Sequence, residues 1–515
     1  MSTRQRDRRP VDFLADSFWA PAEALRAQYN LDVEILPDEN RLRGQGSIHL
    51  VNPLEEPIKK LALEGPRYGH GSYSVHTVGL AKSERRDDPV PTVLTLPRPL
   101  ESGETVVLKL EFETRLMVAD EGVMLLYHWY PRLWWGYPTA DAYRVSIHSP
   151  PSWEGVGSGQ PCGQFQWQGQ GMRTFGAALG SELEILRKNA GLTRVAALSR
   201  RTNRAGAERL LEIACDVIHV CRDEFGFYPH SHLAITPGFS HSVGGFNLGT
   251  GVICVHSQQD VAAQSDLYWQ WIMAHEIGHM YWGEHILEKG SDFWMLGGPN
   301  HYAEAPGWLW IAMGLYVDWM YFRRRNLSAA MHDKLLDHYR EGMQRGHDTT
   351  VERPYEQLKD PGFDYNNVVV HGKGFAFLMA LEGLLGQEAF GRIYRRCLRE
   401  YGGRRLGPAQ FQLQCERETG QDLEWFFSQW LRSSRYPGMD IDRGEGQVQV
   451  KPRGGMLMPA HIEVQFDGDK VQSGLIERVP GNAEVILKGS GVPTDIRMDP
   501  RATHVASSGT KNEEA

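Results

Sequence analysis

The spacing of apolar residues changes twice along the chain, and these changes restrict its fold more than any other feature. Between Tyr29 and about Arg115, short apolar runs such as LDVEIL, GSIHLV and TVVLKLEFE are separated by Pro, Gly, Asn and Asp, which is typical of β-strands. After about residue 205, runs such as DLYWQWIMAHEIGHMYWG and GKGFAFLMALEGLLG have the spacing of amphipathic or buried helices. Beyond Pro437, strand-like alternation returns in QVQVKP, HIEVQF and AEVILKG. We expect an α+β chain that is β-rich at both ends and mainly helical in the middle.

The length of 515 residues requires several domains, because single hydrophobic cores stop growing near roughly 250–300 residues. We place an N-terminal β domain, a sandwich or saddle, at residues 28–176 and a mainly helical domain at 177–436. A small C-terminal β-sandwich follows at 437–508. The basic segment 1–27 and the tail 509–515 have little to bury, and we expect both to be disordered.

Composition argues against two kinds of partner. The net charge of -9 gives no basic footprint for nucleic acid. No stretch approaches the roughly 18 uncharged apolar residues of a membrane span, and no apolar core follows the polar start MSTRQRDRRP. We expect a cytoplasmic protein that binds neither nucleic acid nor membrane, and the sequence leaves its oligomeric state open.

Six cysteines are sparse for this length, and none forms a CxxC pair. Disulfides and a thiolate zinc site are therefore not expected. Cys215 and Cys221 lie in the helical run LLEIACDVIHVCRDEF, where we expect buried thiols.

The stretch HEIGH, residues 275–279, matches the HExxH pattern. Positions i and i+4 share one face of a helix, so His275 and His279 can direct ring nitrogens at one zinc ion. Glu276 would then lie beside the metal, where it can take a proton from the activated water and pass it to a leaving group. The competing interpretation makes both histidines hydrogen-bonded core residues of a Trp-rich helix.

Five stretches together resemble the aminopeptidase N family of zinc metallopeptidases, in the gluzincin group that also includes leukotriene-type epoxide hydrolases. They are HEIGHMYWG at 275–283, GGFNLG at 244–249, HGKGFAFLMALEGLLGQEAF at 371–390, DLEWFFSQWL at 422–431 and HWYPRL at 128–133. The order of a β domain, a helical domain and a small β domain is also the family's order. The resemblance implies a thermolysin-like catalytic domain, a zinc ion and a peptide-like or other small substrate.

The family's third zinc ligand has no counterpart here. The resemblance places a Glu about 19 residues after the second His, and the two alignments that we weighed put Gly297 or Met313 at that position. We take Glu304 of PNHYAEAPGW as the expected replacement, with His371 as the next candidate. Nearby side chains that could also bind the metal are Glu284, Glu288, Asp292 and His301.

Two more family positions have changed. The Glu of the family's GxMEN strand, which binds a substrate's free α-amino group, corresponds to Asn247, so that Gly244, Gly245 and Asn247 are the implied substrate-binding residues. The Tyr of the family's YxKG, which stabilises the oxyanion, corresponds to His371 of HGKG. A protonated His371 could donate to an oxyanion, and a neutral one could bind the metal.

Three functions follow from these residues. The first is a zinc-dependent hydrolase in which Glu276 activates water and substrate recognition differs from that of an aminopeptidase. The second is a catalytically inactive aminopeptidase-like binding or scaffold protein. The third is an aminopeptidase that acts on a specialised peptide.

Overall fold

The computed structural model divides into two compact units, Met1–Ala303 with Glu400–Leu406, and Glu304–Arg399 with Gly407–Ala515. Both tails predicted from the sequence lie almost wholly outside the described residues, and the predicted domain boundaries stay predictions. The structure describes residues 27–52, 55–66, 72–77, 80–81, 92–133, 139–239, 244–256, 265–288, 308–327, 336–337, 339–347, 350–351, 366–434, 438–453, 460–467, 471–476, 485–498 and 507–509.

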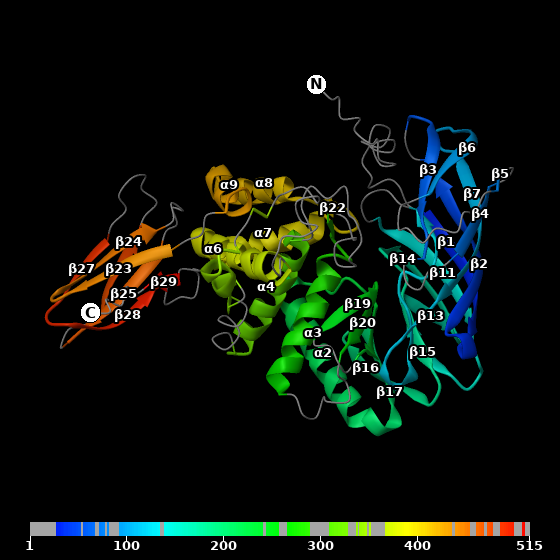
Figure 1. The fold of residues 1–515 in the computed structure, drawn as a ribbon, viewed down its shortest axis with the longest axis horizontal. Coiled ribbons are helices and arrows are strands. Elements are labelled where there is room, and N and C mark those ends of the chain that lie inside the picture. Colours follow the sequence, from blue (N-terminus) through cyan, green and yellow to red (C-terminus); the bar gives the residue numbers. More distant parts are fainter. Residues whose placement is uncertain are drawn as a thin grey trace. The chain divides into compact units, whose positions relative to one another are not determined.

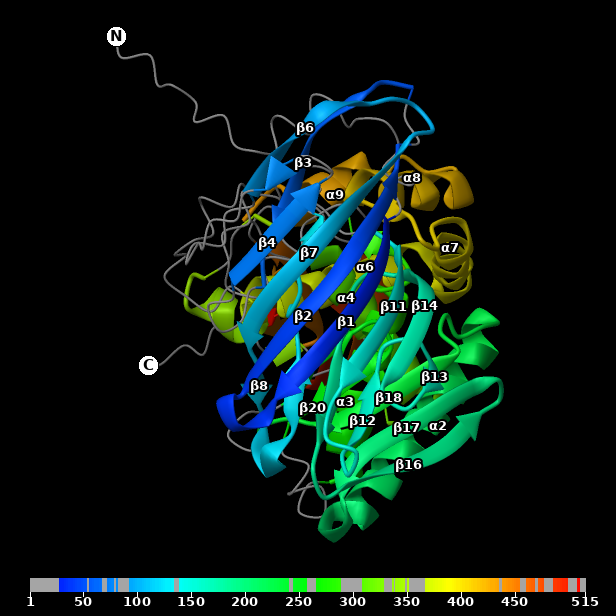
Figure 2. The same ribbon diagram turned by 90° about the vertical axis from the view of Figure 1, so that its right-hand side faces the viewer.

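The first unit begins with an eight-stranded sheet in the order β13-β14-β11-β1-β2-β7-β4-β5. Its long strands lie side by side in Figure 2. In β1, burial alternates so that Tyr29, Leu31 and Val33 are covered while the residues between them are exposed or half-buried, which leaves one polar sheet face. The strands are β1 (Ala27–Leu36), β2 (Arg41–Val51), β4 (Ser72–Thr77), β5 (Leu80–Ala81), β7 (Thr105–Arg115), β11 (Asp141–His148), β13 (Gln160–Gly163) and β14 (Gln166–Met172).

Two smaller sheets contribute to the core of this unit. One has the order β10-β3-β6 and the other β12-β15-β9-β8. Buried residues of the large sheet and of these sheets form one hydrophobic cluster, with Trp129, Tyr143 and Phe175 among its largest side chains. The strands are β3 (Ile58–Glu64), β6 (Thr92–Leu100), β8 (Met117–Val118), β9 (Met124–Leu126), β10 (Arg132–Leu133), β12 (Glu154–Gly157) and β15 (Ala177–Gly180), and the short 3₁₀ turns are η2 (Pro37–Glu39), η3 (Asp120–Gly122) and η4 (Arg201–Asn203).

A five-stranded sheet in the order β16-β17-β18-β20-β19 completes the first unit. Helix α2 packs on β16 and β17, helix α3 contacts α2 and β19, and β12 contacts β16, β17 and β18. Figure 1 shows the two helices on one side of this sheet. The elements are β16 (Leu183–Ala190), β17 (Thr193–Arg200), α2 (Arg204–Phe225), β18 (His232–Pro237), β19 (Gly245–Gly249), β20 (Val252–Val255) and α3 (Asp266–Tyr281).

The chain also returns to the first unit after a long excursion. Strand β22 (Arg405–Leu406) pairs in parallel with β21 (Leu287–Glu288), which follows α3. The Gly403 N–H donates to the His285 carbonyl oxygen at 2.7 Å, and the Leu287 N–H donates to that of Arg404 at 2.8 Å. A segment from far along the sequence therefore holds the chain that leaves the HEIGH helix.

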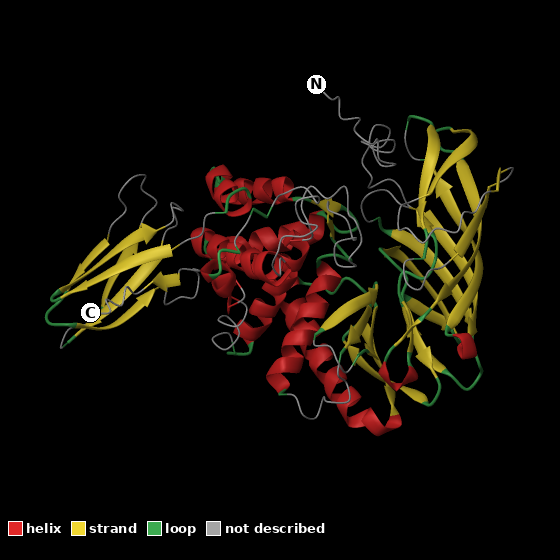
Figure 3. Cartoon of the chain, viewed as in Figure 1, coloured by secondary structure: helices red, strands yellow, loops and turns green. Residues whose placement is uncertain are grey.

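Helices dominate the first part of the second unit, shown in red in Figure 3. The stretch Asn367–Leu385 is long and apolar enough to cross a membrane, which the sequence expectation missed. Of its most apolar window, 78% is buried, as expected for a core helix. The elements are α4 (Trp308–Arg324), the π-helical η8 (Asn366–Lys373), α6 (Gly374–Leu385), α7 (Gln387–Glu400), α8 (Pro408–Thr419) and α9 (Glu424–Leu431).

Two small sheets close the second unit, in the orders β27-β24-β23-β29 and β26-β25-β28. They share a hydrophobic cluster that includes Val448, Val450, Ile462 and Phe466. The mixed α+β class, with strands at both ends and helices in the middle, is confirmed. The strands are β23 (Gly438–Gly444), β24 (Gln447–Arg453), β25 (Ala460–Phe466), β26 (Gln472–Ile476), β27 (Val485–Lys488), β28 (Pro493–Met498) and β29 (Ser507–Gly509).

Candidate metal centre

Helix α3 carries HEIGH and is apolar on nearly all sides. The Tyr268 N–H donates to the side chain of its N-cap, Ser265, and Asp266 places a carboxylate in the first turn, where the helix dipole favours negative charge. From Ile272 to Tyr281 every residue except His275 is buried. A helix that is hydrophobic all round is stable only inside a core, so the surrounding elements fix the position of its two histidines.

The two histidine rings converge. The Nε2 atoms of His275 and His279 are 3.1 Å apart, and the rings meet edge to face with centroids 4.5 Å apart. His279 is buried and His275 is half-buried. At this separation the two nitrogens can share a proton in a hydrogen bond, or both can direct lone pairs at one cation.

Glu276 lies between the helix and the edge strand of the five-stranded sheet. Its side chain is 2% exposed, and a Cβ atom added to Gly245 of β19 would lie 3.1 Å from its Oε1. Burial raises the pKa of the Cys254 thiol on the neighbouring strand β20 well above its usual value, and the Glu276 carboxylate raises it further. A glycine at position 245 is therefore what allows β19 to pass this close to the carboxylate.

Among the described residues β19 is the edge strand of its sheet, and its outer side carries the backbone of Gly245 and Asn247. The Gly244 carbonyl accepts from the His256 N–H at 3.0 Å, and the Gly244 N–H donates to the Tyr268 hydroxyl at 3.0 Å, so both backbone groups of Gly244 are already bonded. Because bonded and non-bonded pairs alternate in an antiparallel ladder, Gly245 and Asn247 turn their backbone groups away from β20.

The Asn247 side chain shares a sheet face with Gly245, since residues two apart on a strand project to the same side. Gly245 faces Glu276, so Asn247 projects toward the same side as that carboxylate. Its Nδ2 and Oδ1 atoms are both buried, and neither has a hydrogen-bond partner among the described residues. A buried amide in this state costs about 1–3 kcal/mol per unsatisfied group, which a bound polar ligand can offset.

A buried polar cluster anchors the chain just after α3. Gly283 adopts φ 122°, a conformation that favours glycine, and it turns the chain so that Glu284 leaves the helix. The Glu284 carboxylate accepts from Arg173 Nη1 at 3.3 Å and from the Thr250 hydroxyl. Glu284, weighed from the sequence as a metal ligand, is thus bonded to residues of other strands and loops.

His230 anchors the last turn of the same helix. Its Nε2 is 3.2 Å from the Met280 carbonyl oxygen, to which it donates when protonated on that nitrogen. Burial, helped by the neighbouring His285, lowers the pKa of His230 to about 4. The ring is therefore neutral at pH 7. No local sequence pattern indicates a role for His230, which belongs to the short run PHSH before β18.

The structure describes only some of the other predicted ligands. Glu304, Asp292, His301 and Gly297 lie outside the described residues. His371 belongs to the second unit, where it is half-buried in the π-helical η8. Met313 is fully buried in α4, and its carbonyl accepts from the Tyr394 hydroxyl at 2.8 Å. Within the described part of the chain, no group of three His, Cys, Asp or Glu side chains is arranged to hold a metal ion.

Lys373, two residues after His371, holds the π-helical stretch in place. Lys373 is fully buried, and its Nζ donates to the Ser433 carbonyl oxygen at 3.0 Å, just beyond α9. π-Helical turns are rare and are frequently found at functional sites. The Lys of HGKG therefore has a structural partner at the end of α9.

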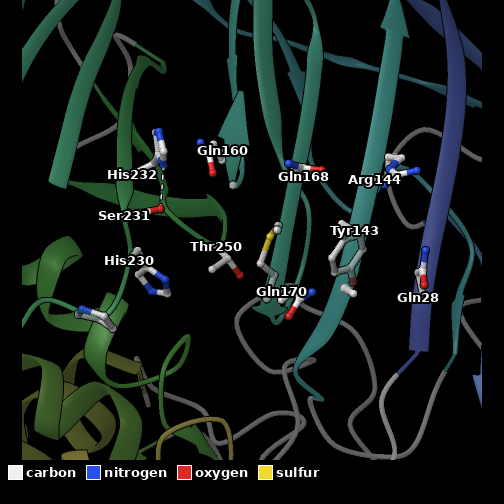
Figure 4. A pocket seen from close by; sticks show the side chains of 15 residues that line it. Gln28, Tyr143, Arg144, Gln160, Gln168, Gln170, His230, Ser231, His232 and Thr250 are labelled. Atoms are coloured by element: carbon white, nitrogen blue, oxygen red, sulfur yellow. Dashed lines mark hydrogen bonds between the residues drawn. The ribbon is translucent and has the colours of Figure 1, made fainter. Parts of the chain in front are cut away.

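A large cavity of about 700 Å³ opens elsewhere in the first unit, and no residue of α3 lines it. Figure 4 shows Gln160, Gln168, Arg144 and Gln28 on strands of the large sheet, opposite His230 and His232. None of the described residues that line it is a carboxylate. This cavity is therefore distinct from the HEIGH pair.

Comparison with known proteins bears on the region that carries HEIGH. No curated protein matches the chain. Residues 227–430, from just before β18 to the last turn of α9, match the model for the Peptidase family M1 domain. This match supports membership of the M1 aminopeptidase family, which is generally zinc-dependent, and with it a metallopeptidase-like hydrolase.

Proposed function

We propose that the chain is a zinc-dependent hydrolase that cleaves a peptide-like or other small amide substrate and is not a conventional aminopeptidase. The observation that carries the proposal is the 3.1 Å approach of the His275 and His279 Nε2 atoms, next to a buried Glu276 that faces the edge strand β19.

The histidine pair fits a zinc ion. Two nitrogen ligands of one tetrahedral zinc, each about 2.0–2.1 Å from the metal, lie roughly 3.3–3.4 Å apart. The observed separation of 3.1 Å is close to this value. The third ligand is proposed to be Glu304, with His371 as the alternative. When bound, zinc would supply the Lewis acidity that lets water ionise near neutral pH.

Glu276 is proposed as the general base. It accepts a proton from the attacking water and then delivers it to the leaving nitrogen as the amide bond breaks. Its burial at 2% exposure limits competition from bulk water for that proton. A protonated His371 is proposed to donate to the oxyanion.

Strand β19 is proposed to align the substrate. An extended peptide can add to an exposed strand edge through main-chain hydrogen bonds, and Gly245 and Asn247 present their backbone groups there. The buried, unsatisfied amide of Asn247 would bond a polar group of the substrate. An amide lacks the charge that strengthens a bond to an ammonium by about twofold, so recognition of a free N-terminus is expected to be weak.

Metal analysis and one isosteric variant test the proposal. Protein purified without chelator is expected to contain one zinc ion per chain, His275→Ala is expected to lose it, and Glu276→Gln is expected to keep it. Hydrolysis of a fluorogenic amide panel should fall by at least about 100-fold in Glu276→Gln. Absence of zinc from the wild-type protein would remove the metal-dependent mechanism.

The same variant separates the rival functions. The loss of the family's Glu ligand, with Gly297 or Met313 in its place, favours a catalytically inactive binding protein as the second candidate. If the wild-type protein binds zinc but hydrolyses the amide panel no faster than Glu276→Gln does, the inactive binding protein is the correct assignment. The aminopeptidase function is tested with pairs of substrates, an aminoacyl amide and its N-acetylated form. An aminopeptidase must cleave the substrate with the free amine faster than the acetylated one.

A further inference from the structure

A second cavity, of about 400 Å³, lies in the first unit between the β13–β14 hairpin with β12 and the strands β16, β17 and β18. It adjoins the larger cavity of Figure 4, because Gly159 and His232 line both. A volume of about 300–1,000 Å³ is typical of small-molecule sites. No residue of α3 lines it, so it is separate from the HEIGH pair.

Two arginines project into this cavity from neighbouring strands. Arg194 on β17 is paired with Asn189 on β16 and with His232 on β18. Arg187 on β16 is paired with Ala196, which lies two residues along β17 from Arg194 and therefore on the same sheet face. Laterally paired residues project from the same sheet face, which brings both guanidinium groups to one wall. In the described part of the structure, neither one forms an ion pair; Arg187 donates to the Ile185 carbonyl at 3.3 Å.

The side chains described around this cavity are mostly basic, whereas the whole chain has a net negative charge. The whole sequence has 55 basic and 64 acidic residues. By contrast, the described residues that line this cavity include three basic side chains, Arg187, Lys188 and Arg194, and one carboxylate, Glu154. Lys188 is 3.4 Å from Glu212, so its charge is partly matched already. The two arginines therefore carry most of the unmatched positive charge, and a guanidinium suits carboxylate or phosphate geometry.

The opposite wall is apolar and aromatic. Trp167 on β14 and Phe165 beside it are buried, with ring centroids 6.3 Å apart, and Val156 of β12 extends this surface. Ile185 of β16 adds an apolar side chain to the wall that carries Arg187. Phe165 has φ 53°, a left-handed conformation that costs a non-glycine residue roughly 1–2 kcal/mol. Such conformations cluster at ligand sites, where the surroundings hold them.

His232 adds an unsatisfied polar atom between the two cavities. Its Nδ1 is 3.0 Å from the Ser231 hydroxyl, and its Nε2 is buried with no hydrogen-bond partner among the described residues. When Ser231 donates to Nδ1, Nε2 carries the proton and lacks an acceptor. A buried donor in this state costs about 1–3 kcal/mol unless a ligand accepts from it.

We propose that this cavity binds a small organic anion, a carboxylate or phosphate attached to an apolar or aromatic body. Arg187 and Arg194 bind the anionic group, His232 Nε2 donates to it, and the body rests on Phe165, Trp167 and Ile185. The site is independent of the metal centre.

Calorimetric titration of the full-length protein with three matched probes tests the proposal. 1-Naphthylacetate and 1-naphthyl phosphate carry the two anionic groups on one aromatic body, and 1-naphthalenemethanol is neutral. At least one anion is expected to bind below about 1 mM and at least tenfold more tightly than the alcohol. The tighter anion identifies the preferred head group. Failure of both anions to bind, or equal binding of the alcohol, would overturn the proposal.

Three variants locate the site. Arg194→Gln should weaken anion binding about five- to tenfold, and Glu154→Gln should tighten it, because a nearby like charge is removed. Arg144→Gln is the matched control, since Arg144 lines only the larger cavity and has no ion pair among the described residues. An equal loss in Arg144→Gln and Arg194→Gln would contradict the assignment.

Two further measurements separate loss of the anion site from misfolding and from effects of the metal centre. Arg194 is exposed, so thermal unfolding of Arg194→Gln should match the wild type and exclude misfolding. His275→Ala should bind the anion as the wild type does, so the test stands even where the metal-site proposal fails. Loss of anion binding in His275→Ala would show that the two sites are one, against the inference.

Discussion

Glu284 has 2% of its side chain exposed and lies against Arg173, which has 9% exposed. Removing one partner of a buried ion pair leaves a buried charge without compensation, which costs about 3–5 kcal/mol. Glu284→Ala is therefore expected to lower the free energy of unfolding by about that amount, measured by urea denaturation. Glu212→Ala, in which an exposed partner of Lys188 is lost, should change it by less than about 0.5 kcal/mol. A small effect at position 284 would show that the cluster does not anchor the chain after α3.

His230 predicts a pH dependence of stability. Its folded-state pKa of about 4 lies below the ordinary 6.5, so between these values the unfolded chain binds more protons. The stabilisation is complete above about pH 6.5 and is lost as pH falls toward 4, by up to about 3 kcal/mol. Thermal unfolding of wild type and His230→Gln across this range should show a smaller pH slope in the variant. Parallel curves for the two proteins would refute the assignment.

The sequence predicts only some of the contacts that the residues in and after α3 make. The i, i+4 spacing of HEIGH predicted that the two imidazoles would share a face, and the structure confirms it. The partners of the helix end, Arg173, His230 and Thr250, come from distant strands and loops, so no local pattern indicates them. Of the predicted site residues, Glu304 lies outside the described residues, and the roles of Asn247 and His371 stay predictions.

At the scale of elements, β19 packs so closely against α3 that position 245 has little room for a side chain. A Cβ added to Gly245 would lie 2.9 Å from the Cys254 carbonyl oxygen and 3.1 Å from Glu276 Oε1, and backbone cannot give way as a flexible side chain can. Gly245→Ala is therefore expected to destabilise the protein by about 1–3 kcal/mol.

A second glycine serves as the control. Gly391 in α7 has its nearest neighbour, the end of the Arg395 side chain, 3.4 Å from an added Cβ. Gly391→Ala should stabilise by about 0.5–1 kcal/mol, because alanine favours the helix. Thermal unfolding of both variants checks the opposite signs. A Gly245→Ala variant as stable as the wild type would mean that β19 moves easily away from Glu276.

Long elements were predictable and short ones were not. The helical periodicity of residues 207–227, 266–283, 307–325 and 372–386 is confirmed by α2, α3, α4 and α6. The strands β16, β17, β18 and β20 were missed inside a region read as mainly helical. Burial of β18 and β20 is nearly continuous, with VICV wholly buried, so these short runs lack the alternation that marks a strand.

At the scale of the molecule, the division into two units does not follow the order of the sequence, because residues 400–406 belong to the first unit. Sequence periodicity marks changes of secondary structure, whereas this division depends on which distant segments touch. A fragment that ends at residue 303 lacks β22, the partner of β21. It should unfold several degrees below the full-length chain, as followed by circular dichroism.

A longer fragment provides the comparison. A chain that ends at residue 434 keeps β22 and omits β23–β29, whose buried residues form their own cluster. Its first unit should unfold at the full-length temperature, within about 2 °C. Equal melting of the 303- and 434-residue fragments would show that β22 contributes nothing to the first unit.

The pairing of β21 with β22 also affects the order in which the nascent chain folds during translation. The ribosome delivers Leu287 long before Arg405, and at about 5–20 residues per second the roughly 120 residues between them take about 6 to 24 s. During that interval β21, which follows α3, lacks its partner strand β22. Translation speed between these two points therefore decides how long an incomplete first unit is exposed to chaperones and proteases.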